Sequence, residues 1–115
     1  MGFTTKINWE PLRSLNTATN PTFGAGGYAA LGNPLANPSY ILKLVNNSNV
    51  LVTISIDGVT DIDVAPANSF WLYDEDEGSQ GQKALPEGTQ IYVKSGTGAA
   101  GIGLVYLVSQ YIIVI

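Results

Sequence analysis

The carboxylates are the side chains best able to do chemistry in this chain, because the sequence contains no cysteine and no histidine. That absence excludes thiol nucleophiles, Ser-His-Asp triads and zinc sites built on Cys or His. The acids gather in two runs, at residues 57–63 and 74–77. An enzyme on this chain would therefore depend on carboxylates, Lys, Tyr or hydroxyl groups.

Neither acidic run has the pattern of a known type of site. Calcium binds clustered oxygen ligands, but the EF-hand spacing is absent from both runs. Asp61 and Asp63 are two residues apart, so in a strand they share the solvent side opposite Ile62 and Val64. The run 74–77 is typical of a solvated loop whose charges favour solubility. We therefore predict a non-enzymatic protein with no catalytic residue, no metal and no cofactor.

A glycine pattern near the C-terminus invites a nucleotide-binding interpretation. Residues 96–101 have the sequence GTGAAG, which matches the G-x-G-x-x-G pattern. Dinucleotide binding requires a helix directly after this loop, within a βαβ unit. The 14 residues that follow Gly101 are typical of a strand and include no acid for a ribose. The pattern therefore indicates a flexible hairpin loop.

Charges are few and unevenly distributed. Charged residues make up 12% of the chain, whereas a typical globular chain has about 25%. Residues 1–50 have a net charge of +2, and residues 51–115 have a net charge of −6. An acidic body argues against a nucleic-acid partner, which requires clustered Lys and Arg. We expect no signal peptide, because the first residues lack a basic region followed by an apolar run. We also expect no membrane partner, because the longest apolar stretch, residues 102–115, is shorter than the ~20 residues of a membrane helix.

Residues 39–115 have the patterns of β-strands. Runs of β-branched and aromatic residues alternate with turn residues such as Asp57-Gly58, and no run keeps a helical period. We predict an all-β domain over residues 39–115, a small antiparallel β-sandwich or barrel. Its expected strands are 40–45, 50–57, 61–64, 69–73, 89–94 and a final strand made of 104–108 and 111–115.

Residues 1–38 differ from this domain in composition. They hold four of the six prolines and five of the thirteen glycines, which predicts a long irregular N-terminal arm with one short helical turn at 10–15. The segment also carries many large apolar side chains, more than a solvated linker uses. These side chains must be buried on something, and an extended arm could reach a neighbouring copy.

The final strand is apolar on both faces. It is either the central strand between two layers or a contact in an assembly, because an exposed strand of this kind would aggregate. A small body leaves little else to cover it, so we expect some intermolecular contact. The candidate assembly contacts are apolar and aromatic residues of the arm and of the final strand: Trp9, Leu12, Phe23, Tyr28, Tyr111, Ile113 and Ile115.

Several segments together resemble small virion structural proteins of tailed bacteriophages, over roughly residues 28–108. The segments are YAALGNPL at 28–35, NPSYILK at 37–43, NNSNVLVTISIDGVTD at 46–61, PEGTQIYVK at 86–94 and GLVY at 103–106. The resemblance implies a β-sandwich present in many copies on the capsid or at the head–tail junction, with no catalytic residues.

On that basis we expect a capsid decoration (cement) protein of the virion, a homo-oligomer whose other partners are the major capsid protein or further virion proteins. A neck or head–tail connector component is the nearest alternative. A carbohydrate-binding module of a fibre or adhesin is an alternative from another class, with Trp71 and Tyr92 as the residues to test, because exposed aromatic rings can stack on sugars.

Overall fold

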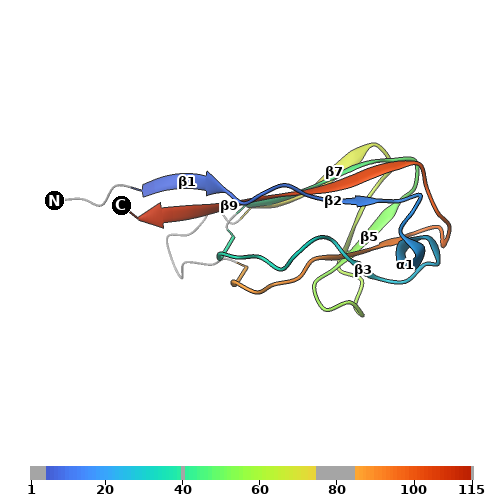
Figure 1. The fold of residues 1–115 in the computed structure, drawn as a ribbon, viewed down its shortest axis with the longest axis horizontal. Coiled ribbons are helices and arrows are strands. Elements are labelled where there is room, and N and C mark those ends of the chain that lie inside the picture. The colour runs from blue at the N-terminus through green and yellow to red at the C-terminus, as the bar shows by residue number, and fades with distance from the viewer. Residues whose placement is uncertain (1–4, 40, 75–84, 115) are drawn as a thin grey trace.

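Two antiparallel β-sheets packed face to face form the protein in a computed structural model that describes residues 5–39, 41–74 and 85–114 (Figure 1). Sheet A has the order β1-β9-β4-β7, and β2 also pairs with β9. Sheet B has the order β3-β8-β5-β6. The predicted all-β sandwich is therefore confirmed.

The elements are short apart from the last strand, and the single helix of the described residues is one turn long. Sheet A contains β1 (Thr5–Trp9), β2 (Arg13–Asn16), β4 (Ile41–Ser48), β7 (Ser69–Asp74) and β9 (Gly103–Val114). Sheet B contains β3 (Ala29–Ala30), β5 (Val52–Ser55), β6 (Asp63–Ala65) and β8 (Tyr92–Ser95). Helix α1 (Pro21–Gly24) begins at Asn20, whose side chain accepts a hydrogen bond from the Phe23 amide. No helix in the described parts of the chain is long and apolar enough to cross a membrane.

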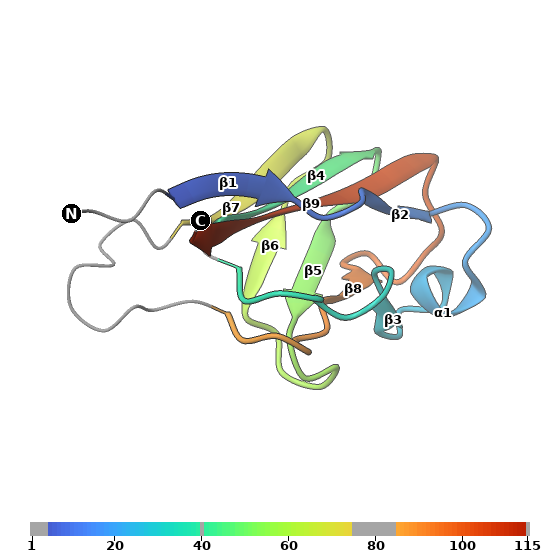
Figure 2. The same ribbon diagram turned by 60° about the vertical axis from the view of Figure 1, so that its left-hand side comes forward.

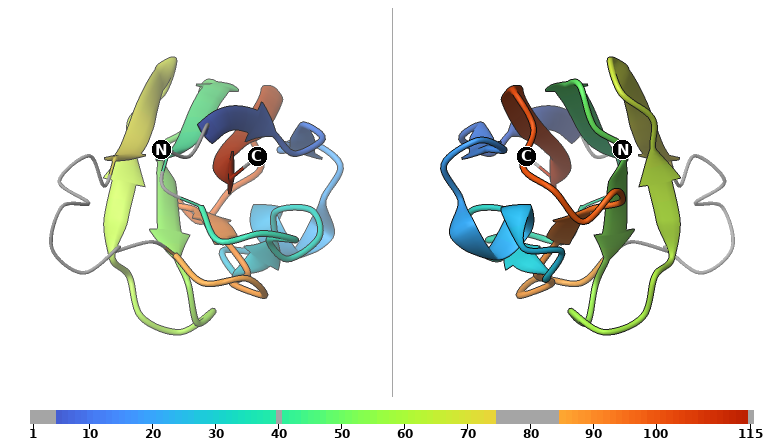
Figure 3. Two further views of the ribbon diagram at one scale, coloured as in Figure 1. Left: turned by 90° about the vertical axis from the view of Figure 1, so that its left-hand side faces the viewer. Right: turned by 90° about the vertical axis from the view of Figure 1, so that its right-hand side faces the viewer.

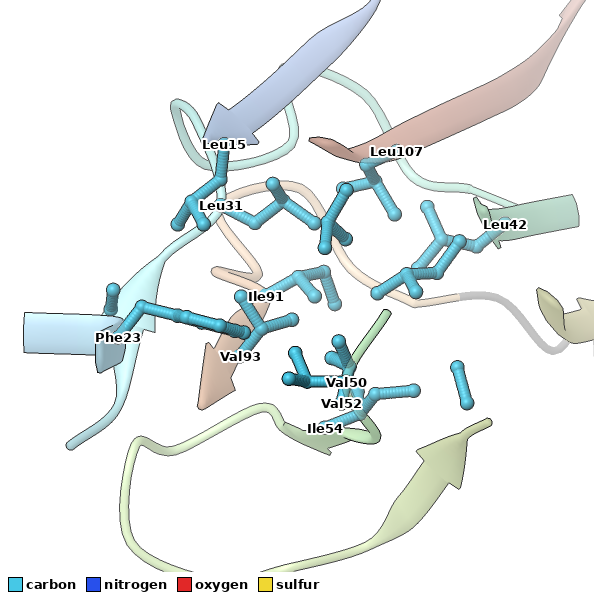
Figure 4. Packing of buried hydrophobic residues seen from close by; sticks show 14 of the residues in the cluster. Leu15, Phe23, Leu31, Leu42, Val50, Val52, Ile54, Ile91, Val93 and Leu107 are labelled. Carbon is cyan, nitrogen blue, oxygen red and sulfur yellow. The ribbon is translucent and has the colours of Figure 1, made fainter. Parts of the chain in front are cut away.

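The hydrophobic core lies between the two sheets, and residues 1–38 contribute to it (Figure 4). Phe23 and Leu31 are fully buried, and Leu15 and Leu35 are almost so. The arm expected outside the sandwich is therefore, from residue 13 to residue 35, part of the sandwich itself. The physical reason is that its large apolar side chains find cover between the sheets of their own chain, where burial of each contributes about 1.5–3 kcal/mol.

Strand β9 is the central strand of sheet A. It pairs with β4 from residue 103 to residue 110 and, along its other side, with β2 and then β1. Val105 and Leu107 point into the core, and Ser109 is fully buried as well. The strand is continuous from Gly103 to Val114, so the two parts of the expected final strand are joined through Ser109 and Gln110.

A β-bulge, and not the expected helical turn at 10–15, separates β1 from β2. Trp9 pairs with Gln110 and Arg13 pairs with Leu107, so three residues of this edge oppose two residues of β9. One extra residue in one strand defines a bulge, and Pro11 favours it because proline has no amide proton for the ladder. The bulge leaves the side chain of Glu10 pointing inward, where it is buried.

Residues 5–9 and 110–114 form a ribbon that projects beyond the sandwich (Figure 1, Figure 2). It consists of β1 and the last five residues of β9, paired from Thr5 with Val114 to Trp9 with Gln110. It lies at one end of a molecule that measures 55 × 23 × 22 Å. A two-stranded ribbon on its own is marginally stable in water.

Buried Asn46 holds the two sheets together at one end of the sandwich. From β4 its side-chain amide donates hydrogen bonds to the main-chain oxygens of Val50 at 2.8 Å, Ala65 at 2.9 Å and Pro66 at 3.1 Å. Val50 precedes β5, and Ala65 ends β6. The side chain therefore joins sheet A to the start and the edge of sheet B.

Candidate assembly surface

The outward side of sheet A carries apolar side chains in rows that run across the strands. Residues directly opposite each other in an antiparallel pair point to the same side of the sheet. One row contains Tyr106, Val45 and Phe70, and the next contains Val108, Lys43 and Leu72. Trp9 extends the surface onto β1, because it pairs with Gln110, two residues along from Val108. We call the set Trp9, Val45, Phe70, Leu72, Tyr106 and Val108 the apolar face.

The apolar face is open to solvent at its outer strands. Trp9 is 59% exposed, Phe70 56% and Leu72 49%, while the residues on β4 and β9 are half-buried. Single exposed apolar side chains are ordinary, but a contiguous apolar surface on a small monomer marks an interaction site. The arrangement can therefore bind another protein by burial of apolar area.

Lys43 provides the charge at the centre of the apolar face. It lies between Leu72 and Val108 in its row, and its Nζ lies 5.5 Å from the centroid of the Phe70 ring. At this distance a cation is attracted to the face of an aromatic ring. Among the outward positions of the two central rows, Lys43 is the one charged residue, and Asp74 follows at the end of the next row. A partner that covers the centre can pair with Lys43 if it supplies an anionic group.

A shallow hollow of about 210 Å³ adjoins the apolar face between β4 and β7. Its lining includes Lys43, Val45, Asn68 and Phe70. Asn68 has a positive φ of 57°, a conformation that Asn tolerates better than most residues, and its amide bonds to the Ser48 oxygen. The hollow is large enough to receive a side chain of a docking partner.

Two of the expected assembly contacts lie on the surface near the ribbon. Trp9 belongs to the apolar face, and Leu12 lies in the bulge and is 61% exposed. Leu12 lines a second hollow of about 410 Å³ together with Glu10, Arg13 and Pro34. These positions agree with a role in assembly, which stays a prediction.

The other expected contacts are placed differently. Phe23 is fully buried in the core of its own chain, so it offers no surface to a partner. Tyr111 is half-buried, and its hydroxyl accepts a hydrogen bond from Asn8 at 3.4 Å. Ile113 pairs with Lys6 in the ribbon, and Ile115 lies outside the described residues. Tyr28 lies against the loop after β5, far in sequence from the ribbon.

Residues 56–64, which we call the acidic loop, form a second surface with apolar and acidic residues interleaved. Val59 is 80% exposed, and Ile56, Ile62 and Val64 are each between 43% and 45% exposed. Between them lie three exposed acids, Asp57, Asp61 and Asp63.

Hydrogen bonds fix the turn of the acidic loop around Asp57. Its Oδ1 accepts from the amides of Thr60 at 2.7 Å and Val59 at 2.8 Å, and from the Ser55 hydroxyl at 2.7 Å. These bonds, led by the Thr60 and Val59 amides, hold the pKa of Asp57 well below its usual range. Asp57 is therefore a structural anion that stays charged at neutral pH.

A cluster of three residues ties the far end of the acidic loop to sheet B. The Tyr28 hydroxyl donates to Asp61, and Lys94 forms a salt bridge of 3.2 Å with the same carboxylate. Lys94 also lies 4.7 Å from the centroid of the Tyr28 ring. The bonds from Tyr28 and Lys94 lower the pKa of Asp61, while burial and then the bond to Asp61 raise the pKa of Tyr28. The acidic loop is thus anchored at both ends.

Glu10 and Arg13 form an ion pair next to the bulge. Besides Arg13, Glu10 accepts bonds from the amides of Ala36 at 3.2 Å and Asn37 at 2.8 Å. Burial raises the pKa of Glu10, but the bonds from Arg13, Asn37 and Ala36 outweigh that effect, so the pKa is lowered overall. A carboxylate occupied by so many donors stabilises structure and is not placed to act as a base.

The aromatic residues proposed for sugar binding belong to different sheets. Trp71 belongs to sheet A, packs against the core and donates from Nε1 to Asp63 at 2.7 Å. Tyr92 belongs to sheet B, where its ring lies beside Gly58. Residues 96–101 connect β8 of sheet B to β9 of sheet A, so they cross between the sheets and do not form the expected hairpin, and a strand follows them. No group of three or more acids close enough to hold a metal ion is found within the described residues.

Phe70 and Leu72 were not among the expected contacts, although the sequence contains a signal for them. In residues 70–73 both alternating sets are apolar or aromatic, Phe70 with Leu72 and Trp71 with Tyr73. This is the same property that singled out the final strand. Comparison with protein-family models, with curated proteins and with solved structures found no match for this chain.

Proposed function

We propose that this chain is a non-enzymatic structural component of a tailed-phage virion, a capsid decoration protein that stabilises the head by docking through its apolar face and the ribbon. The observation that carries the proposal is the contiguous apolar face of sheet A with its exposed Trp9, Phe70 and Leu72. The strand and turn patterns resemble virion structural proteins, and this resemblance is the reason for proposing a virion as the assembly.

The energetics of docking suit a protein of this size. Full burial of one large apolar side chain contributes about 1.5–3 kcal/mol, so a few of them on the apolar face favour a stable contact once the cost of association is met. Strand β7 forms one edge of sheet A, and β1 with β2 forms the other. Sheet edges add main-chain hydrogen bonds to such a contact when a partner strand pairs with them.

The engaged carboxylates support a structural role over an enzymatic one. Glu10, Asp57 and Asp61 each accept hydrogen bonds that fix a loop or a bulge. A general acid or base needs access to a substrate proton and a pKa near the working pH. All three acids instead have lowered pKa values and serve the fold.

The test is the presence of the chain in purified particles. Tailed particles made with the wild-type gene are purified on a density gradient, and the chain is counted by quantitative mass spectrometry against the most abundant particle protein. The proposal predicts a copy number comparable to that protein, and a small fixed number per particle would instead place the chain at the neck. Absence from the particles would contradict the proposal.

Matched variants test whether the apolar face is the docking surface. Phe70→Asn with Leu72→Asn removes two exposed apolar side chains from the face and is expected to abolish incorporation. Ile102→Asn is the control, because Ile102 is 75% exposed in the loop before β9 and lies off the face. Equal incorporation of both variants, with equal thermal unfolding midpoints, would show that the chain docks through another surface.

A further inference from the structure

We infer that the apolar face of one copy docks on the acidic loop of a second copy, head to tail. This inference deepens the proposed assembly role and rests on it, because it names the chain itself as a partner at this surface. The supporting observation is that this chain has two surfaces with exposed apolar side chains, one of which contains a cation and the other acids.

The two surfaces match in kind and oppose in charge. The apolar face surrounds one cation, Lys43, with Phe70 and Leu72. The acidic loop presents exposed apolar side chains, Val59 foremost, beside acids that include Asp57 and Asp63. Contact between them buries apolar area on both sides and brings acids to Lys43, whereas the two central rows of the apolar face contain none.

Pairing like with like would be electrostatically unfavourable. Two apolar faces packed together would bring two Lys43 ammonium groups into one interface, with no acid in either central row. Two acidic loops packed together would bring the three acids of one copy next to the three acids of the other. Buried like charges cost several kcal/mol, so the head-to-tail contact is the favoured arrangement.

The positions of the two surfaces suit a head-to-tail contact. Sheet A forms one layer of the sandwich, and the tip of the acidic loop extends from sheet B away from sheet A (Figure 2, Figure 3), whereas Asp63 near its end accepts a hydrogen bond from Trp71 of sheet A. A contact between two different surfaces leaves one free copy of each surface at the ends. Such heterologous contacts therefore continue to a third copy and close into a ring where the rotation permits.

The acidic loop is already held in shape before docking. Asp57 fixes its turn, and Asp61 is bound by Tyr28 and Lys94. A surface that is ordered in the free protein loses little conformational entropy on binding. These bonds use no side-chain atom of Val59 or Ile62. Both side chains can therefore be replaced without removing the hydrogen bonds that hold the acidic loop.

The test mixes two variants that each lose one surface. The face variant is Phe70→Asn with Leu72→Asn, and the loop variant is Val59→Asn with Ile62→Asn. Native mass spectrometry and sedimentation follow the wild type, each variant and their mixture at matched ionic strength. The wild type is expected to form closed oligomers that weaken as salt is added, since salt screens charged contacts. Each variant alone is expected to be monomeric, because loss of each apolar contact weakens association by about tenfold or more.

Mixing decides between the arrangements. The head-to-tail contact predicts that the two monomeric variants form a dimer with one copy of each, because one intact face then meets one intact loop. A loop variant that still associates alone would overturn the inference in favour of a face-to-face dimer. Variants that stay monomeric when mixed, or a monomeric wild type, would overturn it as well. Incorporation of the wild type into particles would then leave the proposed function standing with a different partner at the face.

Discussion

The Glu10 carboxylate and the Arg13 guanidinium form a salt bridge of 2.7 Å on either side of the bulge that separates β1 from β2. Both side chains are largely withdrawn from water, with 2% and 9% of their surface exposed. Arg13 also donates to the main-chain oxygens of Asn33 at 2.7 Å and Pro34 at 3.0 Å. The pair therefore fastens the segment after β3 to the edge of sheet A.

Replacing Glu10 should destabilise the fold strongly. Glu10→Gln removes the counter-charge of a buried guanidinium, and loss of one partner of a buried pair costs about 3–5 kcal/mol. Chemical denaturation of the monomer measures this loss of unfolding free energy. Glu87→Gln is the control, because Glu87 is exposed and a change there should stay within about 0.5 kcal/mol. Equal effects of the two substitutions would contradict the structural role of the pair.

The same pair makes stability depend on pH in the acid range. The pKa of Glu10 in the folded protein lies below its ordinary value of 4.5. Its contribution to stability is therefore complete above that ordinary value and is lost as the pH falls through the lowered pKa. Denaturation curves recorded from neutral pH downward should show a decline that is smaller in Glu10→Gln than in the wild type. An identical decline in both proteins would assign the acid sensitivity to other carboxylates.

Asn46 should be far less replaceable than its neighbour Asn47. Asn46→Ala leaves the main-chain oxygens of Val50, Ala65 and Pro66 without this donor, and each buried group left unsatisfied costs about 1–3 kcal/mol. Asn47→Ala, at an exposed position of the same strand, should change stability little. Thermal unfolding at low protein concentration compares the two while limiting any contribution from association. A loss at Asn47 as large as at Asn46 would rule out the link between the sheets as the cause.

Gly103 marks a position where β9 tolerates no side chain. Its φ is +117°, and a Cβ there would lie 2.1 Å from the main-chain oxygen of Asn47. Gly103→Ala therefore combines backbone strain with a clash in the β4–β9 ladder, and we expect a loss of more than about 2 kcal/mol. Gly98→Ala is the control, since Gly98 also has a positive φ but nothing lies within 4 Å of its Cβ position. A Gly103 variant no less stable than the Gly98 variant would contradict this geometry.

The sequence predicted the strands of the body and missed the way residues 1–38 join it. Alternation of apolar and polar residues is a local property, so strands such as β4 and β7 were expected close to where they occur. Pairing of Thr5 with Val114 links residues at opposite ends of the chain, and no local pattern contains it. Prolines and glycines at 1–38 indicate irregular backbone, but they do not show what that backbone packs against.

Only part of the assembly surface was predicted, because a local sequence pattern does not show what a side chain packs against. Trp9 was expected as one of the large apolar side chains of the N-terminal arm, and the structure exposes it. Phe23 has the same character but lies in the core, because the sequence cannot tell burial within the chain from burial in a partner. Phe70 and Leu72 became recognisable only when the register with β4 showed which side of the sheet they share.

Radical footprinting of the assembled particle tests most directly whether the apolar face is the contact surface. Side-chain oxidation is compared between the isolated protein, diluted until it is monomeric, and the chain within particles, with Ile102 as an exposed reference off the face. If the chain docks through the apolar face, Phe70 and Leu72 should be strongly protected from oxidation in the particle, and oxidation of Ile102 should be unchanged. Oxidation of Phe70 and Leu72 that is as fast in the particle as in the monomer would contradict it.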